Sequence, residues 1–133
     1  MSDPDNPFAW IAKAENDLLN IRNNLAQGTV PWDTICFHAQ QAAEKMLKAF
    51  LVWRRVTPPR SHDLAGLLGE CIAQGGAFQQ LLPDCQLLTR SAVESRYPML
   101  NFEPTEADGR EAFAAAERVC TAIRSMIGAA QPP

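Results

Sequence analysis

Apolar residues recur every three or four positions along most of this 133-residue chain, which is the spacing of one face of an α-helix. No stretch shows the strict alternation of apolar and polar residues that is typical of a half-buried strand. Prolines, glycines and capping residues divide the pattern into five predicted helices. These run from Asn6-Pro7 to the residues before Gly28, from Pro31 to near Trp53, from Ser61 to Gly75-Gly76, from Pro83 to about Ser95, and from Thr105 to Gly128.

The second predicted helix has an unusual distribution of side chains. Small and apolar residues, among them Ala42 and Ala43, cover most of its surface, and one narrow polar stripe remains. The stripe consists of His38, Gln41, Lys45 and Lys48, at steps of three and four. Such a pattern predicts a helix surrounded on several sides with one wet strip. We therefore expect the central helix of a bundle, whose strip is either a solvated face or a surface for a partner or ligand.

Local signals predict how the helices begin. Ser61 can cap the third helix, with Asp63 near its positive end. Thr105 and Asp108 resemble a capping box at the start of the fifth, with Asp in place of the preferred Glu or Gln. Glu44 and Lys48 are correctly ordered for an ion pair across one helical turn.

The length and composition indicate one domain spanning residues 1–133, with a core over about 8–127 and flexible tails at 1–5 and 129–133. We expect an all-α, up-and-down antiparallel bundle of about five helices.

The formal net charge of -3 argues against nucleic-acid binding driven by charge alone. The four cysteines show no C-x-x-C spacing and are expected to be buried free thiols. With no signal peptide and no membrane-spanning run, the chain is expected to be cytoplasmic.

The motifs of several common sites are missing from the sequence. There is no phosphate-binding glycine loop, no H-E-x-x-H pair and no nucleophile elbow. The two histidines do not make a convincing zinc site, because the pattern places no carboxylates with them. We therefore expect neither a metal nor a cofactor.

Two further polar clusters are candidates for function. The first contains His62, and its other members are Arg54, Arg55, Arg60, Ser61 and Asp63. Histidine can move a proton near neutral pH and arginine can hold a phosphate, although a capped helix start beside a solvated basic loop explains the same residues. The second cluster is Arg96-Tyr97-Pro98. Its arginine and tyrosine could hold a phosphate and stack on a base, or serve the helix end and the packing.

Taken in order, these segments resemble the HEPN domain, a family named for its occurrence in higher eukaryotes and prokaryotes and for its nucleotide-binding links. The matching segments are Phe37 to Ala49, His62-Asp63-Leu64, Ser95-Arg96-Tyr97-Pro98 and the alanine-rich helix after Thr105, within residues 8–127. The resemblance implies a helical bundle that commonly dimerises. It also implies association with a minimal nucleotidyltransferase, with which some members form toxin-antitoxin pairs. Many members are RNases.

The RNases of this family carry an arginine, four to six residues and then a histidine, normally around the start of the fourth family helix. This chain departs from that pattern, because no histidine follows Arg96. The one spacing match, Arg55 to His62, lies in the wrong segment, across Pro58-Pro59. The nuclease residues of the family therefore do not carry over to this sequence.

The leading hypothesis is a homodimeric binding module that serves as the partner subunit of a minimal nucleotidyltransferase and binds a nucleotide or RNA. The expected ligand-binding residues are Arg96, Tyr97, His62, Lys45, Gln41 and Lys48. One alternative is an RNase toxin with an atypical site built from His62, Arg96 and Arg55. Another is a purely structural dimerisation domain. Three tryptophans suit anchors of a dimer interface, namely Trp10, Trp32 and Trp53.

Overall fold

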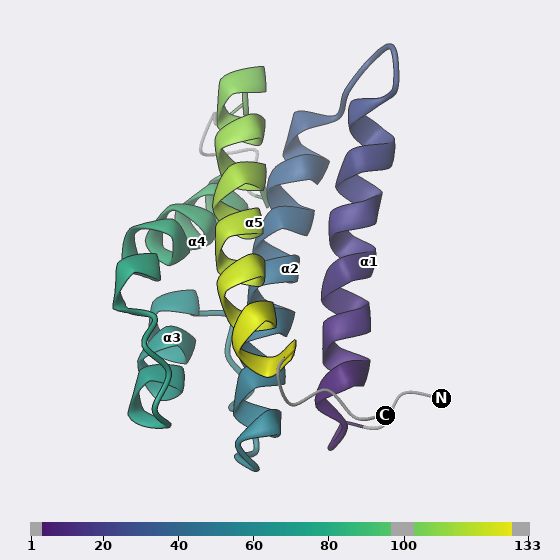
Figure 1. Ribbon diagram of the computed structural model, residues 1–133. Helices are drawn as coiled ribbons and strands as arrows, with labels where there is room; N and C mark the ends of the chain where they lie inside the picture. Colours follow the sequence, from purple (N-terminus) through teal and green to yellow (C-terminus); the bar gives the residue numbers. More distant parts are fainter. Residues whose placement is uncertain (1–3, 97–102, 129–133) are drawn as a thin grey trace.

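Helices form the framework of the protein (Figure 1). The structure is a computed structural model, and it describes residues 4–96 and 103–128. The elements are α1 (Pro7–Leu25), α2 (Trp32–Trp53), α3 (Leu64–Ala73), a 3-10 turn (Gln79–Leu81), α4 (Leu82–Arg96) and α5 (Glu106–Gly128). No strand occurs in these two ranges, and the predicted all-α bundle is confirmed. None of the helices described is long and apolar enough to cross a membrane.

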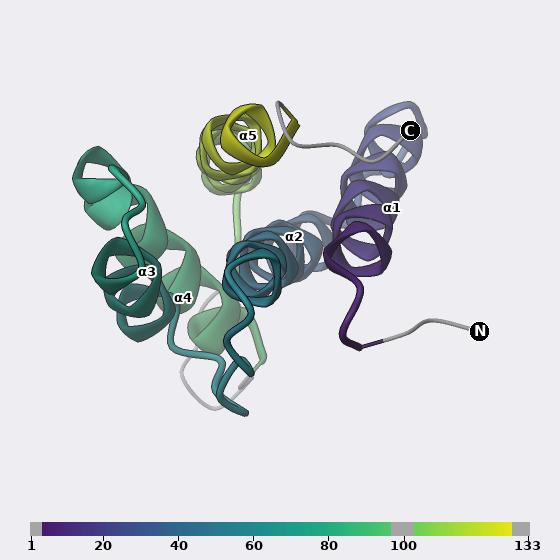
Figure 2. The ribbon, with the colours of Figure 1, turned by 60° about the horizontal axis from the view of Figure 1, so that its bottom comes forward.

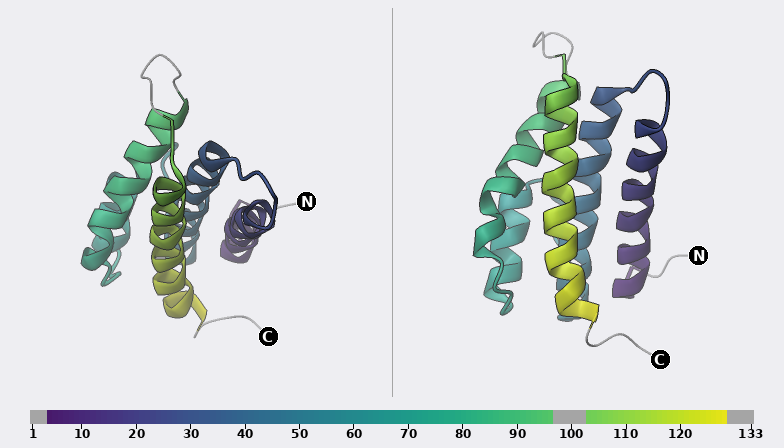
Figure 3. Two further views of the ribbon diagram at one scale, coloured as in Figure 1. Left: turned by 90° about the horizontal axis from the view of Figure 1, so that it is seen from above. Right: turned by 45° about the horizontal axis from the view of Figure 1, so that its top comes forward.

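Helix α2 lies at the centre of the bundle, as its composition predicted. Viewed along the helices, α1 lies on one side of α2, α3 and α4 lie on the other, and α5 covers a third side (Figure 2). The long helices α1, α2 and α5 run side by side (Figure 3). Helices α1 and α5 make few contacts with each other, so α2 holds the two together.

The enclosed position of α2 explains its small residues. Ala39, Ala42, Ala43 and Ala49 are all fully buried. Alanine lets the backbones of neighbouring helices approach closely, and larger side chains fill the space between the helices. The largest of these on α2 are Ile35, Met46, Leu47, Phe50 and Leu51.

Most of the predicted helix starts are confirmed. The Asn6 side chain accepts a hydrogen bond from the Phe8 amide at 3.0 Å, and Pro7 takes the first helical position. Thr105 and Asp108 form the reciprocal capping box, with amide-to-side-chain distances of 2.9 and 3.2 Å. The predicted cap at Ser61 is wrong. Helix α3 begins at Leu64, and the Ser61 hydroxyl instead accepts from the Asp63 amide at 3.1 Å, a local turn that competes with capping.

All four cysteines are buried and unpaired, as predicted. Burial raises the pKa of Cys36 to about 11 and the pKa of Cys71, Cys85 and Cys120 to about 12. The thiols are therefore protonated at neutral pH and behave as small apolar side chains.

The three tryptophans are partly buried within the chain itself. The Trp10 indole donates a hydrogen bond to the Pro4 carbonyl at 2.9 Å. The Trp32 ring lies where Gly109 leaves room for it on α5, and the Trp53 ring lies 5.7 Å from that of Phe50. Part of the apolar surface of each ring is thus already used within the chain, and a role as dimer anchor stays a prediction.

Candidate functional site

Two buried carboxylates organise the polar side of α2. Asp17 of α1 is 6% exposed and Glu44 of α2 is 5% exposed. A buried charge is costly unless it is paired and hydrogen-bonded. Each of these carboxylates meets that requirement because it contacts one histidine and one lysine side chain.

The Asp17 cluster joins α1 to α2. One carboxylate oxygen of Asp17 lies 2.8 Å from Nδ1 of His38, and the other accepts from Nζ of Lys45 at 2.7 Å. The side chains of His38 and Lys45 are 22% and 26% exposed, so each has one end on the buried carboxylate and an edge in solvent. Their positions are therefore set by α1 as well as by α2.

The Glu44 cluster joins α2 to the connector that precedes α3. Oε1 of Glu44 accepts from Nε2 of Gln40 at 3.0 Å and lies 2.9 Å from Nδ1 of His62. Its other oxygen accepts from Nζ of Lys48 at 3.2 Å, which confirms the predicted pair. Gln41 extends the cluster outward by donating to Oε1 of Gln40 at 2.8 Å.

The ionised state of Glu44 indicates that Nδ1 of His62 is protonated. Burial opposes ionisation of the carboxyl group, but hydrogen bonds from Gln40 and His62 and the nearby Lys48 charge outweigh burial and lower the pKa of Glu44. The ionised carboxylate can only accept, so Nδ1 of His62 carries the proton. The His62 side chain is 76% exposed, and its Nε2 edge is therefore available to solvent or a ligand.

The predicted wet strip is confirmed in part. His38, Gln41 and Lys45 are half-buried, with exposed edges. Lys48 does not belong to the strip, because it is only 9% exposed and its ammonium group lies between Glu44 and the Trp10 ring, 6.0 Å from the ring centre. Sequence spacing placed it correctly around the helix but could not show that α1 covers it.

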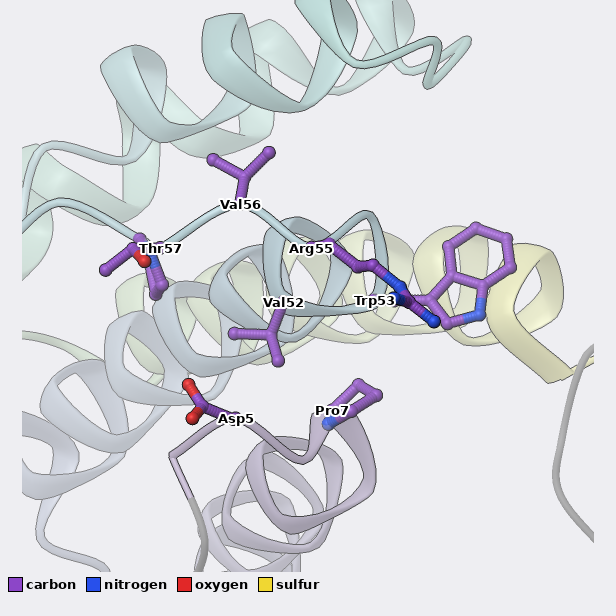
Figure 4. A pocket seen from close by; sticks show the side chains of 8 residues that line it. Asp5, Pro7, Val52, Trp53, Arg55, Val56 and Thr57 are labelled. Atoms are coloured by element: carbon purple, nitrogen blue, oxygen red, sulfur yellow. The ribbon is translucent and has the colours of Figure 1, made fainter.

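The described residues among the expected ligand set divide between the two clusters. Lys45 bonds to Asp17 and His62 bonds to Glu44, so they belong to separate clusters. The side chain of Arg96 and the whole of Tyr97 lie outside the described residues. Arg55 lines a hollow at the end of α2 with Asp5 and Trp53 (Figure 4).

The sequence analysis predicted the pair of Glu44 with Lys48 but did not include in the site the residues that hold it together. Asp17, Gln40 and Glu44 are all buried polar residues. A signal for Asp17 was present, because it interrupts the apolar face of α1 between Ala14 and Ile21. A polar residue on a buried face requires partners, and the lysine and histidine of the neighbouring helix supply them.

The clusters hold hydrogen-bond donors in fixed positions without accumulating positive charge. The charge of Lys45 balances that of Asp17, and the charge of Lys48 balances that of Glu44. Within the described ranges, no group of three or more metal-ligating side chains is placed to hold a metal ion.

The helical bundle and the sequence of its central helix α2 are typical of one domain family. The HEPN domain model matches residues 8–126, and the chain belongs to the HEPN domain family. The chain is similar to TT1696 from Thermus thermophilus, with 22% identity and a TM-score of 0.79, over 90% of this chain and 96% of that one. It is also similar to ST0689, an archaeal HEPN homologue, with 27% identity and a TM-score of 0.73, over 92% and 98% of the two chains. No protein among the curated sequences matches it.

Proposed function

We propose that this HEPN domain is a dimeric binding module that serves as the partner subunit of a minimal nucleotidyltransferase. The observation that supports the proposal is the neutralisation of the polar side of α2. Each lysine and histidine of the two clusters is bonded to the buried carboxylate of Asp17 or Glu44. We name the part that reaches the surface the docking strip, and it consists of His38, Gln41, Lys45 and His62.

The docking strip has the physical character of a protein interface. Buried carboxylates hold His38, Lys45 and His62, and Gln40 holds Gln41, so these side chains lose little conformational entropy when a partner binds. Their partial exposure leaves polar groups free for contacts, and the half-buried Trp10 ring lies 6.0 Å from the Lys48 ammonium that shares Glu44 with His62. Aromatic rings beside positioned polar groups are typical of interface centres.

The charge balance favours a protein partner over an RNA substrate. RNA backbones are bound mainly by lysine and arginine that neutralise phosphates. In the two clusters the carboxylates already neutralise the lysines, and no histidine follows Arg96 to complete the family's nuclease motif. We therefore favour the protein-binding module over the RNase.

Co-expression with the minimal nucleotidyltransferase encoded nearest to this chain tests the proposal. Light scattering and sedimentation should give a dimer of this chain alone and a defined complex with the enzyme. Gln41→Arg places a bulky charge in the docking strip and should weaken the complex at least tenfold. Gln86→Arg is the matched control on α4, because it makes the same change at an exposed position outside the strip.

A stable complex that tolerates Gln41→Arg as well as it tolerates Gln86→Arg would place the interface elsewhere. A chain that stays monomeric and binds no nucleotidyltransferase would contradict the proposal itself. If the pair is a toxin-antitoxin system, expression of one member alone should arrest growth and co-expression should relieve the arrest.

A second candidate is RNA cleavage, and the Glu44–His62 pair favours it. A carboxylate on Nδ1 orients the imidazole with Nε2 outward, an arrangement that suits a general base. Cleavage of a labelled RNA by the pure protein, lost in His62→Ala and retained in His38→Ala, would establish this function. Intact RNA after prolonged incubation with the wild type would exclude it for that RNA.

Nucleotide binding near Arg96 and Tyr97 is also proposed, with His62, Lys45 and Gln41 as further candidates. Lys48 is a poor candidate because Glu44 already binds its ammonium group in a buried site. Calorimetric titration with nucleotides should show binding that weakens at least tenfold in Arg96→Ala, the loss expected for one charge-assisted hydrogen bond. Equal binding by the variant would place any nucleotide elsewhere.

A further inference from the structure

The chain ends two of its helices with the same backbone motif but uses different residues in it. At the end of α3 the amides of Gly75 and Gly76 bond to the carbonyls of Ile72 and Cys71, each at 3.0 Å. At the end of α2 the amides of Arg55 and Val56 bond to the carbonyls of Val52 and Leu51 at 2.9 and 2.8 Å. Both are Schellman motifs, which require a left-handed residue just beyond the helix.

Glycine occupies that left-handed position in α3, and arginine occupies it in α2. Gly75 has φ +96° and Arg55 has φ +64°. Among the described residues, Arg55 is the one non-glycine residue with positive φ. An L-residue with a long side chain is disfavoured in this conformation, whereas glycine adopts it freely. The motif itself therefore does not account for arginine, and backbone strain of this kind points to a role for the side chain.

Stabilisation of the helix end does not explain Arg55 either. A cation near the C-terminus of a helix is favourable, but Arg54 already provides one a residue earlier. In the described part of the chain Arg55 takes part in no ion pair. By contrast, Arg22, Arg110, Arg118 and Arg124 each pair with a carboxylate.

The Arg55 side chain lies along a hollow of about 490 Å³, a volume in the range of small-molecule sites. Figure 4 shows the side chain running toward Trp53, with Pro7 and Asp5 across from it. Val52, Val56 and Pro58 give the hollow an apolar lining, and Trp53 is half-buried at its side. An unpaired guanidinium next to a partly exposed indole is thus present in one concave site.

We propose that this hollow binds a ligand that carries both a planar aromatic ring and a phosphate group. Arg55 binds the phosphate through its planar fork of donors. The Trp53 ring already contacts Phe50 and the Arg54 guanidinium, 5.8 Å from its centre, and its remaining exposed surface offers a place for stacking. Asp5 accepts a hydrogen bond from a hydroxyl or amino group of the ligand. The same chemistry occurs in a free nucleotide and at the 5′-phosphorylated end of an RNA. The site is separate from the docking strip and does not depend on a nucleotidyltransferase partner.

The left-handed backbone of Arg55 allows a test in which glycine replaces it. Arg55→Gly removes the proposed phosphate donor and places the favoured residue in the motif. The melting temperature should rise by about 3 °C while the affinity for AMP falls at least tenfold. A purely structural role for Arg55 predicts no such opposite movement of stability and affinity. Arg60→Ala is the matched control, because it removes one charge from the same connector outside the hollow, and it should retain AMP affinity within twofold.

Calorimetry with AMP, adenosine, inorganic phosphate and a 5′-phosphorylated oligoribonucleotide identifies the ligand chemistry. AMP should bind at least tenfold more tightly than adenosine or phosphate alone, because each of these lacks half of the recognised group. An oligonucleotide that binds more tightly than AMP assigns the site to RNA ends, and equal or weaker binding assigns it to free nucleotides.

Three results would overturn the proposal. One is unchanged AMP affinity in Arg55→Gly, another is an equal loss in Arg60→Ala, and the third is failure of both AMP and the phosphorylated oligonucleotide to bind the wild type. The first of these, together with loss of AMP binding in Arg96→Ala, would place the nucleotide near Arg96 instead of in this hollow. None of these results affects the proposed nucleotidyltransferase complex, whose assembly is measured without nucleotide and should be unchanged in Arg55→Gly.

Discussion

Nδ1 of His62 lies 2.9 Å from Oε1 of Glu44, so a residue of the exposed connector is bonded to a carboxylate on the most enclosed helix of the bundle. The two residues are 18 positions apart in the sequence. The same carboxylate binds Lys48 and Gln40, so one side chain orders α2 and fixes the approach to α3. Its loss should therefore affect both stability and the shape of the surface.

Glu44→Gln should lower the free energy of unfolding by about 3 kcal/mol, because it leaves the Lys48 ammonium buried without its counter-charge. Urea unfolding at pH 7 measures this change. Glu70→Gln makes the same chemical change at an exposed position on α3 and should stay within about 0.5 kcal/mol of wild type. Equal stability of the two variants would mean that the Glu44 cluster contributes nothing to folding.

The stability difference between wild type and Glu44→Gln should depend on pH. Because the pKa of Glu44 is lowered in the folded state from its ordinary value of 4.5, the carboxylate contributes stability that is fully present above that value. This contribution is lost as the pH falls through the folded-state pKa. Unfolding curves between pH 7 and pH 3 should show the difference shrinking in the acidic part of the range. A difference that grows on acidification would mean that the pKa of Glu44 is raised, not lowered, in the folded state.

The sequence predicted the helices well because their determinants are local. Proline, glycine and the Thr105–Asp108 capping box act within a few residues, and the periodicity of α2 reports directly how enclosed it is. Ser61 shows the limit of such signals, since capping and a local turn use the same hydroxyl. Residue type alone therefore does not distinguish the two arrangements.

The site was harder to predict because it depends on pairs from different helices. Spacing along α2 identified His38 and Lys45, but their common partner Asp17 lies on α1. Only the packing of α1 on α2 decides which polar residues become buried and which stay wet. The same packing buried Lys48, which the helical pattern alone assigned to the wet strip.

Gly109 and Gly69 should respond in opposite directions to replacement by alanine. A methyl group at Gly109 would lie 2.5 Å from the Trp32 ring, so Gly109→Ala should destabilise the protein by about 1–3 kcal/mol through overpacking. At Gly69, on the exposed side of α3, a methyl group would meet nothing within 4 Å. Gly69→Ala should therefore stabilise by about 0.5–1 kcal/mol through helix propensity. Thermal melts of the two variants provide the comparison, and a stable Gly109→Ala protein would show that the Trp32 ring can move aside.

Ala42 and Ala43 should not tolerate larger side chains. Both are fully buried, and the Cys120 thiol of α5 approaches the Ala42 carbonyl at 3.7 Å. Ala42→Leu and Ala43→Leu should each cost about 1–3 kcal/mol, measured by urea unfolding. Ala107→Leu, at an exposed position in the first turn of α5, is the control and should change stability little. Neutral effects at both core positions would mean that α2 is less tightly enclosed than its burial indicates.

Asp17→Asn tests whether buried carboxylates preorganise the docking strip. The amide cannot neutralise Lys45, so Lys45 and His38 should lose their fixed positions while the exposed surface keeps its composition. Lys45 can turn toward solvent, which limits the cost in folding stability to about 1–2 kcal/mol. Affinity for the nucleotidyltransferase partner should fall at least fivefold, mostly through faster dissociation, because the strip must now be ordered on binding. Glu111→Gln, an exposed change of equal charge on α5, should leave both quantities unchanged. If Asp17→Asn lowers stability as expected but dissociates from the partner at the wild-type rate, the strip is not the binding surface, and Asp17 serves only to join α1 to α2.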